Sequence, residues 1–558
     1  MTDSFDYIIV GAGSAGCLLA DRLSESGKYR VAVLEAGPGD LYFWVHVPLG
    51  YGKSFYDKRI NWAYQTAPDA GLGGRSDYWP RGKVLGGSSS INAMVWIRGD
   101  QLDYADWEKA GNPGWGWDDV LPHFRRIEHN AAGADEWRAI GGNVHVDDVS
   151  ERAHPLAKRF IMAGQQAGLA FNPDFNGPTQ EGIGIYQSTT KGGRRMSAVR
   201  AFLRPAMRRA NLKVLTRTHA LRVMFEGRRA TGVEVMQNGV RRVLLARREV
   251  IVSAGAVNSP QLLQLSGIGP AALLSKFGIP VVQDSPNVGQ NLQDHLGINY
   301  TYRSRVPTLN QELGSWKGKL RAGLTFLLRG KGPLSLSMNQ GGGFVRTRPG
   351  LDRANIQLYF QAISTLGAKA GTRPLTSPDA YAAFSIGLSN CVVEGRGRVE
   401  IASADPLISP HIEPASLATD KEIQDVLDGL HLLRRIADQP AMREVIVEEL
   451  APGPSVTTDA AMLDDFRRRA TTVYHPTCTC RMAPDISTGV VDARLRVYGV
   501  DGLRVVDASV FPQLISGNTN APVMMVASKA SDMILEDARA TPDQIEPFRC
   551  NLVGAKLL

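Results

Sequence analysis

The sequence predicts an α/β fold in which a discontinuous domain with a Rossmann-like parallel sheet is interleaved with an α+β domain built on an antiparallel sheet. Three observations support this prediction. A strand, a glycine-rich turn, a helix and a second strand follow one another at the N-terminus, and segments of the same character recur far along the chain. Between them lie segments in which apolar and polar residues alternate. At 558 residues the chain exceeds the usual size of a single hydrophobic core, so more than one domain is expected.

The N-terminal unit carries the strongest of these signals. Its parts are a strand at 5–10, the G-x-G-x-x-G spacing of Gly11, Gly13 and Gly16, a helix from Cys17 to about Glu25, a strand at 31–34, and Glu35. The glycines permit a tight turn and a close approach of backbone N–H groups to a pyrophosphate, while the helix directs its positive end at the phosphates. Glu35 is placed to accept hydrogen bonds from a ribose diol. The unit predicts a dinucleotide site and leaves FAD and NAD open.

Later segments predict further parts of both domains. Strands are expected at 212–215, 248–253 and 503–506, a second close turn at 254–256, and helices that begin at Ser259–Pro260 and at Ala521–Pro522. The alternating segments at 355–363 and 397–403 predict an antiparallel sheet with one exposed face. We therefore assign residues 1–155, 196–312 and 468–540 to the dinucleotide-binding domain, 156–195 and 313–467 to a substrate-binding domain, and 541–558 to a C-terminal tail.

Composition limits the classes of function. Hydrophobic residues make up 43% and charged residues 21% of the chain, which is typical of a soluble globular protein, and no apolar run reaches the ~18 residues of a membrane span. The early first strand leaves no room for a signal peptide, and five irregularly spaced cysteines favour a reducing compartment, so a cytoplasmic location is expected.

The net charge of +8 comes from scattered basic residues without a nucleic-acid motif, which indicates solvated surface rather than nucleic-acid binding. Peripheral attraction to an anionic inner-membrane surface is the alternative.

Four parts of the sequence together resemble the glucose–methanol–choline (GMC) family of flavin oxidoreductases. They are VGAGSAG with VLEAG, RGKVLGGSSSINAM at 81–94, GAVNSPQLLQLSGIGP at 255–270, and YHPTCTCRM with VVDASVFP and GNTNAP near the C-terminus. The resemblance spans nearly the whole chain and is strongest to choline and long-chain alcohol dehydrogenases. It implies FAD as the dinucleotide and an alcohol as the substrate. The cofactor contacts that it implies are Gly11, Gly13, Ser14, Ala15, Gly16, Glu35, Ala36, Arg81, Gly86, Gly87, Ser88, Asn92, Ala93, Met94, Ala220, Ala254, Asp507, Ala508, Asn518 and Ala521.

One position in the segment RGKVLGGSSSINAM, residues 81–94, predicts how FAD is attached. Some family members carry there a histidine that bonds covalently to the flavin. Its counterpart in this chain is Ile91, which cannot form such a bond. We therefore expect non-covalent FAD.

The resemblance also implies the catalytic residues. Alcohol oxidation by hydride transfer requires a base for the hydroxyl proton, and His475 in YHPTCTCRM is the histidine that the family places at the flavin. Asn520 is expected beside it, orienting the substrate oxygen. His295 is expected to be structural or near the flavin edge. No metal is expected at His475, Cys478 and Cys480, since a second pair of ligands is missing. A cysteine nucleophile with His475 as its base conflicts with the dinucleotide motifs.

The leading hypothesis is an FAD-dependent dehydrogenase that oxidises a primary alcohol to an aldehyde by hydride transfer to flavin N5 and passes electrons to a quinone or other carrier. The alternatives are an oxidase of the same fold that forms hydrogen peroxide, a non-redox flavoprotein similar to hydroxynitrile lyases, and a non-catalytic FAD-binding protein. Tyr359 and Phe360 are candidates for an aromatic wall around choline, or for ordinary sheet packing. An apolar pocket for aliphatic or aromatic alcohols is preferred to a choline cage.

Overall fold

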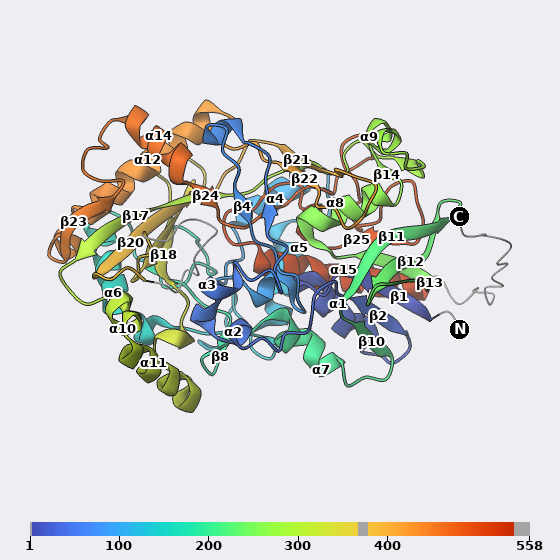
Figure 1. The fold of residues 1–558 in the computed structure, drawn as a ribbon, viewed down its shortest axis with the longest axis horizontal. Coiled ribbons are helices and arrows are strands. Elements are labelled where there is room, and N and C mark those ends of the chain that lie inside the picture. Colours follow the sequence, from blue (N-terminus) through green and yellow to red (C-terminus); the bar gives the residue numbers. More distant parts are fainter. Residues whose placement is uncertain (1–2, 367–377, 541–558) are drawn as a thin grey trace.

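A seven-stranded mixed sheet forms one end of the computed structural model, which describes residues 3–366 and 378–540 (Figure 1). The strand order is β10-β2-β1-β13-β12-β11, and β25 pairs with the C-terminal part of β13. Strands β10, β2, β1, β13 and β25 run parallel, whereas β11 and β12 form an antiparallel extension. Their bounds are β1 Ser4–Val10, β2 Val31–Leu34, β10 Leu212–Leu215, β11 Thr218–Glu226, β12 Arg229–Gln237, β13 Val240–Val252 and β25 Leu503–Val505.

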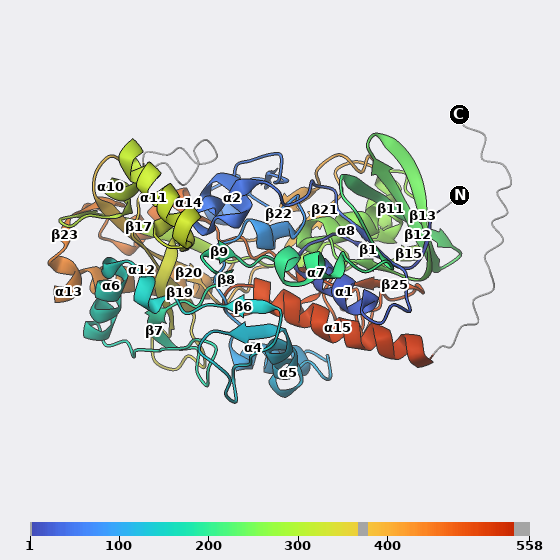
Figure 2. The same ribbon diagram turned by 90° about the horizontal axis from the view of Figure 1, so that it is seen from below.

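Helices α1 (Ser14–Ser24), α5 (Trp117–Ile127) and α15 (Asn520–Ala540) pack together beside this sheet (Figure 2). Helix α1 begins three residues before the predicted Cys17, directly after the glycine turn. Helix α15 extends beyond the predicted range at both ends. The predicted strand–turn–helix–strand unit is therefore confirmed, with the helix in closer contact with the turn than expected.

Helix α8 (Gly255–Leu265) begins four residues before the predicted Ser259, so Pro260 lies inside it. Proline there cannot donate to the carbonyl of Ala256, four residues earlier. The hydroxyl of Thr479 donates to that carbonyl instead, at 2.7 Å. A hydrogen bond from a distant segment thus allows a helix start that local sequence rules do not predict.

The second sheet is antiparallel and has the order β23-β17-β20-β19-β18-β7, with β24 paired to β17. Its strands are β7 Gly182–Ile185, β17 Leu296–Ser304, β18 Asn339–Val345, β19 Ile356–Gln361, β20 Ala383–Asn390, β23 Ile446–Ala451 and β24 Thr471–Thr472. All residues of β20 and all but the last of β19 are buried. The prediction of one exposed face is wrong for 355–363, because α12 (Asp420–Ala437) packs on these strands on one side, and the other side lines the cavity described below. It is confirmed for 397–403, where the antiparallel strand at 397–400 alternates between buried residues and more accessible ones.

Two strands differ from the predicted grouping. Strand β21 (Gly397–Glu400) belongs to a separate small sheet with β16 (Gln290–Leu292) and β22 (His411–Glu413), rather than to the second sheet. Strand β17 pairs with the second sheet although it lies in the range 196–312 that was assigned to the dinucleotide-binding domain. The chain thus crosses between the two sheets at residue 296, and the remaining domain boundaries stay predictions.

The remaining elements are mostly short. The helices are α2 Phe43–His46, α3 Tyr51–Ser54, α4 Gln101–Lys109, α6 Pro155–Gln166, α7 Arg204–Ala206, α9 Ala271–Lys276, α10 Leu309–Gly314, α11 Trp316–Arg329, α13 Pro440–Arg443 and α14 Asp459–Arg469. The strands are β3 Tyr64–Gln65, β4 Tyr78–Trp79, β5 Glu128–Asn130, β6 Val144–Val146, β8 Thr190–Lys191, β9 Arg194–Arg195, β14 Ile268–Gly269 and β15 Gln283–Asp284. Among the described residues, no helix has the length and apolar character that crossing a bilayer requires.

Candidate active site

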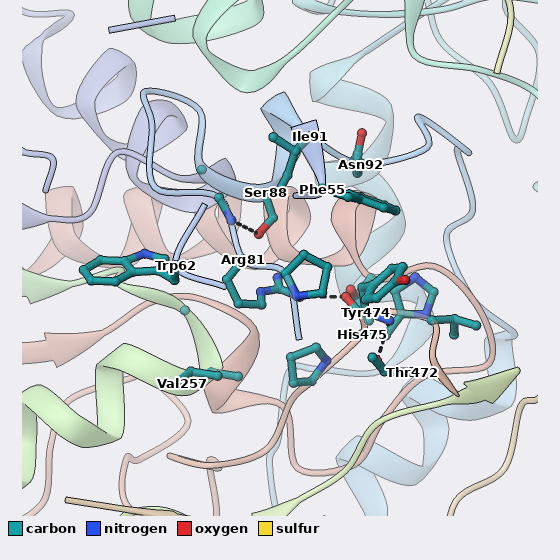
Figure 3. Close-up of a pocket in the computed structure, with 18 of the residues that line it drawn as sticks. Phe55, Trp62, Arg81, Ser88, Ile91, Asn92, Val257, Thr472, Tyr474 and His475 are labelled. Atoms are coloured by element: carbon teal, nitrogen blue, oxygen red, sulfur yellow. Dashed lines mark hydrogen bonds between the residues drawn. The ribbon is translucent and has the colours of Figure 1, made fainter. Parts of the chain in front are cut away.

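A cavity of about 920 Å³ is lined by residues of both large sheets. That volume is at the upper end of the ~300–1,000 Å³ of typical small-molecule sites. Figure 3 shows Trp62 at one end of the pocket, Tyr474 and His475 at the other, and Arg81 between them. One side of the cavity is formed by the parallel sheet and its glycine turn, and the other side by the second sheet.

The glycine turn has the shape of a phosphate-binding loop. A Cβ atom on Gly11 would lie 2.4 Å from the Ser253 carbonyl oxygen, and one on Gly16 would lie 1.9 Å from the Gly11 carbonyl oxygen. At Gly13 the only neighbour within 4 Å would be the Ser253 oxygen, at 4.0 Å, and Gly13 lines the cavity. Gly13 is also the N-cap of α1 and has no side chain to cap it. The backbone N–H groups of the first helical turn are thereby left for an anion such as a pyrophosphate.

Two further features fit a bound dinucleotide. Glu35 lines the cavity at the end of β2 and accepts hydrogen bonds from the backbone N–H groups of Ala12 at 3.2 Å and Gly37 at 2.8 Å. Burial raises the pKa of Glu35 to about 7. The hydroxyl of Ser253, on the cavity wall, is buried without a hydrogen-bond partner among the described residues. A ligand that carries hydroxyl and phosphate groups would supply the missing partners.

The segment at 81–94 closes over the glycine turn. A Cβ atom on Gly87 would lie 2.8 Å from the Gly13 Cα atom, and the N–H of Gly86 donates to the Ala12 carbonyl at 2.7 Å. Arg81, whose pKa is lowered by burial, donates to the carbonyl of Tyr474 at 2.7 Å. Ile91 lines the cavity as a buried side chain. This segment therefore connects the predicted phosphate site to the segment that carries His475.

The structure brings most of the predicted site residues to one cavity. Its lining includes Gly11, Gly13, Ser14, Ala15, Glu35, Ala36, Arg81, Gly87, Ser88, Asn92, Ala93, Met94, Ala220, Ala254, His475, Asp507, Ala508, Asn518 and Asn520. Gly16, Gly86 and Ala521 are not part of it. The two glycines allow close packing of the turn, and Ala521 is buried in the core beside the parallel sheet.

A chain of hydrogen bonds fixes the ring of His475. His295 Nε2 lies 3.2 Å from the Cys391 carbonyl oxygen, which can only accept a hydrogen bond, so His295 carries its proton there. His295 Nδ1 is then the acceptor for His475 Nδ1–H, at 3.1 Å. His475 Nε2 is consequently left unprotonated. Burial, together with the positive charge of Arg81, holds the pKa of His475 well below its usual range, which also favours this neutral base.

The neighbour of His475 is Asn518 rather than the predicted Asn520. Asn518 Nδ2 lies 3.1 Å from His475 Nε2. Asn520 is the first residue of α15, and its Oδ1 accepts a hydrogen bond from the Ser14 hydroxyl at 2.7 Å. The helix start turns the Asn520 side chain toward α1 and the glycine turn. The placement of Asn520 beside His475 is thus corrected, and Asn518, predicted as a cofactor contact, occupies that position.

Two residues of β19 hold Asn518 in place: Gln357, which sequence reasoning missed, and Tyr359, which it named only as a candidate aromatic wall. Gln357 Nε2 donates to Asn518 Oδ1 at 3.1 Å, which directs Nδ2 at His475. The hydroxyl of Tyr359 donates to Gln357 Oε1 at 2.7 Å and so orients that amide. Tyr359 lines the cavity, whereas Phe360 stacks on Phe160 in the core. The two-residue period of a strand is the signal that separates Tyr359 from Phe360.

The cysteine alternatives find no support in the geometry. The described residues contain no cluster of three or more metal-ligating side chains. Cys478 and Cys480 are fully buried, and burial raises the pKa of Cys478 to about 11. A thiol with such a pKa is not a ready nucleophile at neutral pH.

The fold and the cavity are those of an α/β protein with a dinucleotide-type glycine turn and a buried pair of histidines in one cavity. Comparison with known proteins narrows this class: the sequence matches GMC oxidoreductase over residues 5–297 and again over 393–527. The chain therefore belongs to the GMC oxidoreductase family, whose members use FAD, and it is an alcohol and choline dehydrogenase-like enzyme that acts on CH–OH groups.

Similar proteins cover almost the full length of the chain. An alcohol dehydrogenase [acceptor] of Pseudomonas putida is 43% identical over 95% of this chain and 96% of its own. An oxygen-dependent choline dehydrogenase of Vibrio vulnificus is 42% identical, covering 98% of this chain and 96% of its own. The crystal structure of pyridoxine 4-oxidase from Mesorbium loti superposes with a TM-score of 0.86 at 31% identity, covering 95% of this chain and 99% of the other. The expected family and fold class are confirmed.

Proposed function

We propose that the protein oxidises a primary alcohol to an aldehyde, with His475 as the base and Asn518 as the residue that orients the substrate oxygen. The observation that supports this most strongly is the hydrogen-bond chain from the Cys391 carbonyl through His295 to His475. It leaves Nε2 of a neutral imidazole at the cavity wall, 3.1 Å from an amide donor. A hydroxyl group bound beside this pair, within hydrogen-bond distance of both nitrogens, would replace their direct contact: it would give its proton to Nε2 and accept a hydrogen bond from Asn518.

The residues around the cavity have separate roles in the proposed reaction. FAD, when bound along the glycine turn and the 81–94 segment, supplies the group that accepts the hydride. His475 takes the hydroxyl proton, and this makes the oxygen an alkoxide as the hydride leaves the neighbouring carbon. Asn518, held by Gln357, stabilises the negative oxygen by donating a hydrogen bond. Burial of His475 and His295 keeps the proton acceptor away from bulk water.

The charges of the cavity favour a neutral alcohol over choline. Three carboxylates line it, and each already has partners. Glu35 accepts from two backbone N–H groups, Asp507 from Gly255 and Ser259, and Asp77 from Thr471 and Thr472. Four arginines also line the cavity: Arg75, Arg81, Arg468 and Arg469. Three of the four are paired, Arg75 with Asp77, Arg468 with Asp464 and Arg469 with Asp465. What weighs against choline is therefore that, among the described lining residues, no carboxylate is left without a partner to face a quaternary ammonium group.

The substrate class is tested by anaerobic titration of the purified holoenzyme with a panel of alcohols that includes choline. We expect aliphatic or aromatic primary alcohols to bleach the visible flavin absorption and choline to do so at least about tenfold less efficiently. Bleaching by choline alone would contradict the neutral-alcohol assignment. A flavin band that no alcohol bleaches, combined with cleavage of a hydroxynitrile, would contradict alcohol oxidation itself and support the lyase alternative.

We propose a carrier such as a quinone, rather than oxygen, as the electron acceptor. The carrier proposal follows the name of the Pseudomonas putida relative, alcohol dehydrogenase [acceptor], whereas the oxidase alternative follows the name of the Vibrio vulnificus relative, oxygen-dependent choline dehydrogenase. Turnover in air-saturated buffer should therefore produce hydrogen peroxide far more slowly than a soluble quinone is reduced. Peroxide formation at the quinone-dependent rate would instead establish the oxidase alternative.

FAD should be held without a covalent bond. Ile91 packs in a small apolar cluster with Val45, Ile60 and Val84 and offers no nucleophile to the flavin. We expect acid precipitation or heating to release all of the FAD into the supernatant, measured by its absorbance after the polypeptide is removed. Yellow colour that stays with the denatured polypeptide would contradict this expectation.

His295 should act as a positioning residue through its effect on His475. Protonated His475 cannot accept the substrate proton, so kcat/KM should fall on acidification, with a midpoint below pH 6.5 because the pKa of His475 is lowered. His295→Ala removes the acceptor of the His475 Nδ1–H, which stabilises the protonated ring and fixes its tautomer, so the midpoint should move to lower pH and hydride transfer should slow about tenfold. An unchanged pH profile in the variant would assign His295 a merely structural role.

A further inference from the structure

Helix α11 exposes a stripe of apolar side chains to solvent. Its exposed large apolar residues are Trp316 (71% exposed), Leu320 (54%), Leu324 (50%), Leu327 (58%) and Leu328 (80%). Only Ala322 and Phe326 of this helix are buried. The spacing of three and four residues places the exposed set along one side of the helix. A continuous exposed stripe of this kind marks an interaction surface.

The charges around the stripe all have one sign. The basic residues are Lys317, Lys319, Arg321, Arg329 and Lys331, and the sequence contains no acidic residue between Glu312 and Asp352. Within the part of the chain that the structure describes, none of these five side chains forms an ion pair. Lys53 of α3 adds a further positive charge close to Lys319. The surface therefore combines exposed leucines with uncompensated positive charge.

Helix α11 lies at the periphery of the molecule, and α2 lies beside it in both ribbon views (Figures 1 and 2). Two more exposed apolar residues occur at the start of α2: Leu41 is 88% exposed and Phe43 47%. We call the surface formed by the five exposed apolar residues of α11 and the five basic residues on and directly after this helix the α11 face.

We propose that the α11 face binds the surface of an anionic lipid bilayer, with α11 lying in the plane of the interface. The leucines and Trp316 would enter the boundary between head groups and acyl chains, and the lysines and arginines would meet lipid phosphates. Each such charge near an anionic surface strengthens binding. With 14 residues, α11 is shorter than the ~20 that a spanning helix needs, so it would lie on the membrane.

A second copy of this chain is a poorer occupant of the same face. A two-fold contact through α11 would bring the same five positive charges of each copy together. The described part of this face offers no carboxylate to compensate them. Charge complementarity therefore favours an anionic bilayer.

Sedimentation of the FAD-loaded, full-length protein with vesicles tests the proposal. We expect binding to phosphatidylcholine vesicles that contain 30% phosphatidylglycerol and at least about tenfold weaker binding to pure phosphatidylcholine, with the difference reduced at high salt. The triple variant Leu320→Ser/Leu324→Ser/Leu328→Ser should bind at least about tenfold more weakly. Replacing Lys317, Lys319 and Arg321 by Gln should weaken binding about fivefold for each charge removed.

A matched control uses exposed apolar residues outside the α11 face. The triple variant Ile140→Ser/Val240→Ser/Leu407→Ser, at positions 60%, 60% and 57% exposed, should sediment with vesicles like the wild type. Equal binding by the α11 and control variants, or no vesicle binding by the wild type, would overturn the proposal. A dimer that only the α11 variant dissociates, without vesicle binding, would identify a second copy as the occupant. Vesicle binding requires no turnover, so the test is independent of the proposed reaction.

Discussion

His475→Ala should slow hydride transfer from the alcohol by about 10²–10⁴-fold while FAD stays bound. The expectation rests on the loss of the only ring nitrogen in the His295–His475 chain that faces the cavity as an unprotonated acceptor. Without it the hydroxyl proton has no positioned acceptor as the hydride leaves. The rate of flavin bleaching after anaerobic mixing measures this step directly, and the ratio of visible to protein absorbance measures FAD content.

A histidine remote from this chain provides the control. His431 is exposed on α12, where it contacts Asp459, and His431→Ala should bleach at the wild-type rate. His475→Ala that retains FAD and also bleaches at the wild-type rate would refute the proposed base. Loss of FAD from His475→Ala would point to a structural role, and His475→Gln, which preserves volume and a hydrogen-bonding group, then separates folding from proton transfer.

Asn518→Ala should lower kcat/KM by about 10²–10³-fold, because it removes the donor that stabilises the developing alkoxide. Its amide is oriented by Gln357 and lies 3.1 Å from His475 Nε2. Asn520→Ala, two residues further along the chain, is the matched variant. We expect it to lower kcat/KM less than about tenfold and to weaken FAD binding instead, because its contact is to Ser14 at the start of α1.

The pair of variants discriminates between the two asparagines. Kinetics with a soluble electron acceptor give kcat/KM, and FAD titration of the apoprotein gives the affinity for the cofactor. A larger loss of kcat/KM for Asn520→Ala than for Asn518→Ala, at equal FAD content, would show that Asn520 orients the substrate oxygen. Asn518→Asp would add a negative charge next to the alkoxide and should be at least as impaired as Asn518→Ala.

Local sequence signals predicted the dinucleotide-binding part of the fold well. Strands β1, β2 and β10 lie where apolar runs placed them, and the glycine spacing identified the turn that faces the cavity. These features depend on backbone conformation at single positions, such as the φ of +103° at Gly11. Such a constraint is visible in the sequence, because a positive φ favours glycine at that position.

Features that depend on distant partners were predicted poorly. The start of α8 requires the Thr479 hydroxyl, which is 223 positions away from Ala256 in the sequence. The burial of both faces of β19 depends on α12 and on the cavity, and neither can be read from the strand's own alternation. The choice between Asn518 and Asn520 was decided by where α15 begins, and helix ends are the least certain part of a sequence-based prediction.

His475, the proposed base, and its positioning residue His295 lie next to strands of the second sheet. His295 immediately precedes β17, and the short strand β24, which pairs with β17, ends three residues before His475. The backbone N–H of His475 donates to Asp294 at 2.7 Å, next to His295 in the chain. The imidazole pair is thus assembled by the second sheet alone, whereas the glycine turn belongs to the parallel sheet. Turnover would need both sheets, so a chain whose second sheet is disrupted could bind FAD and still be inactive.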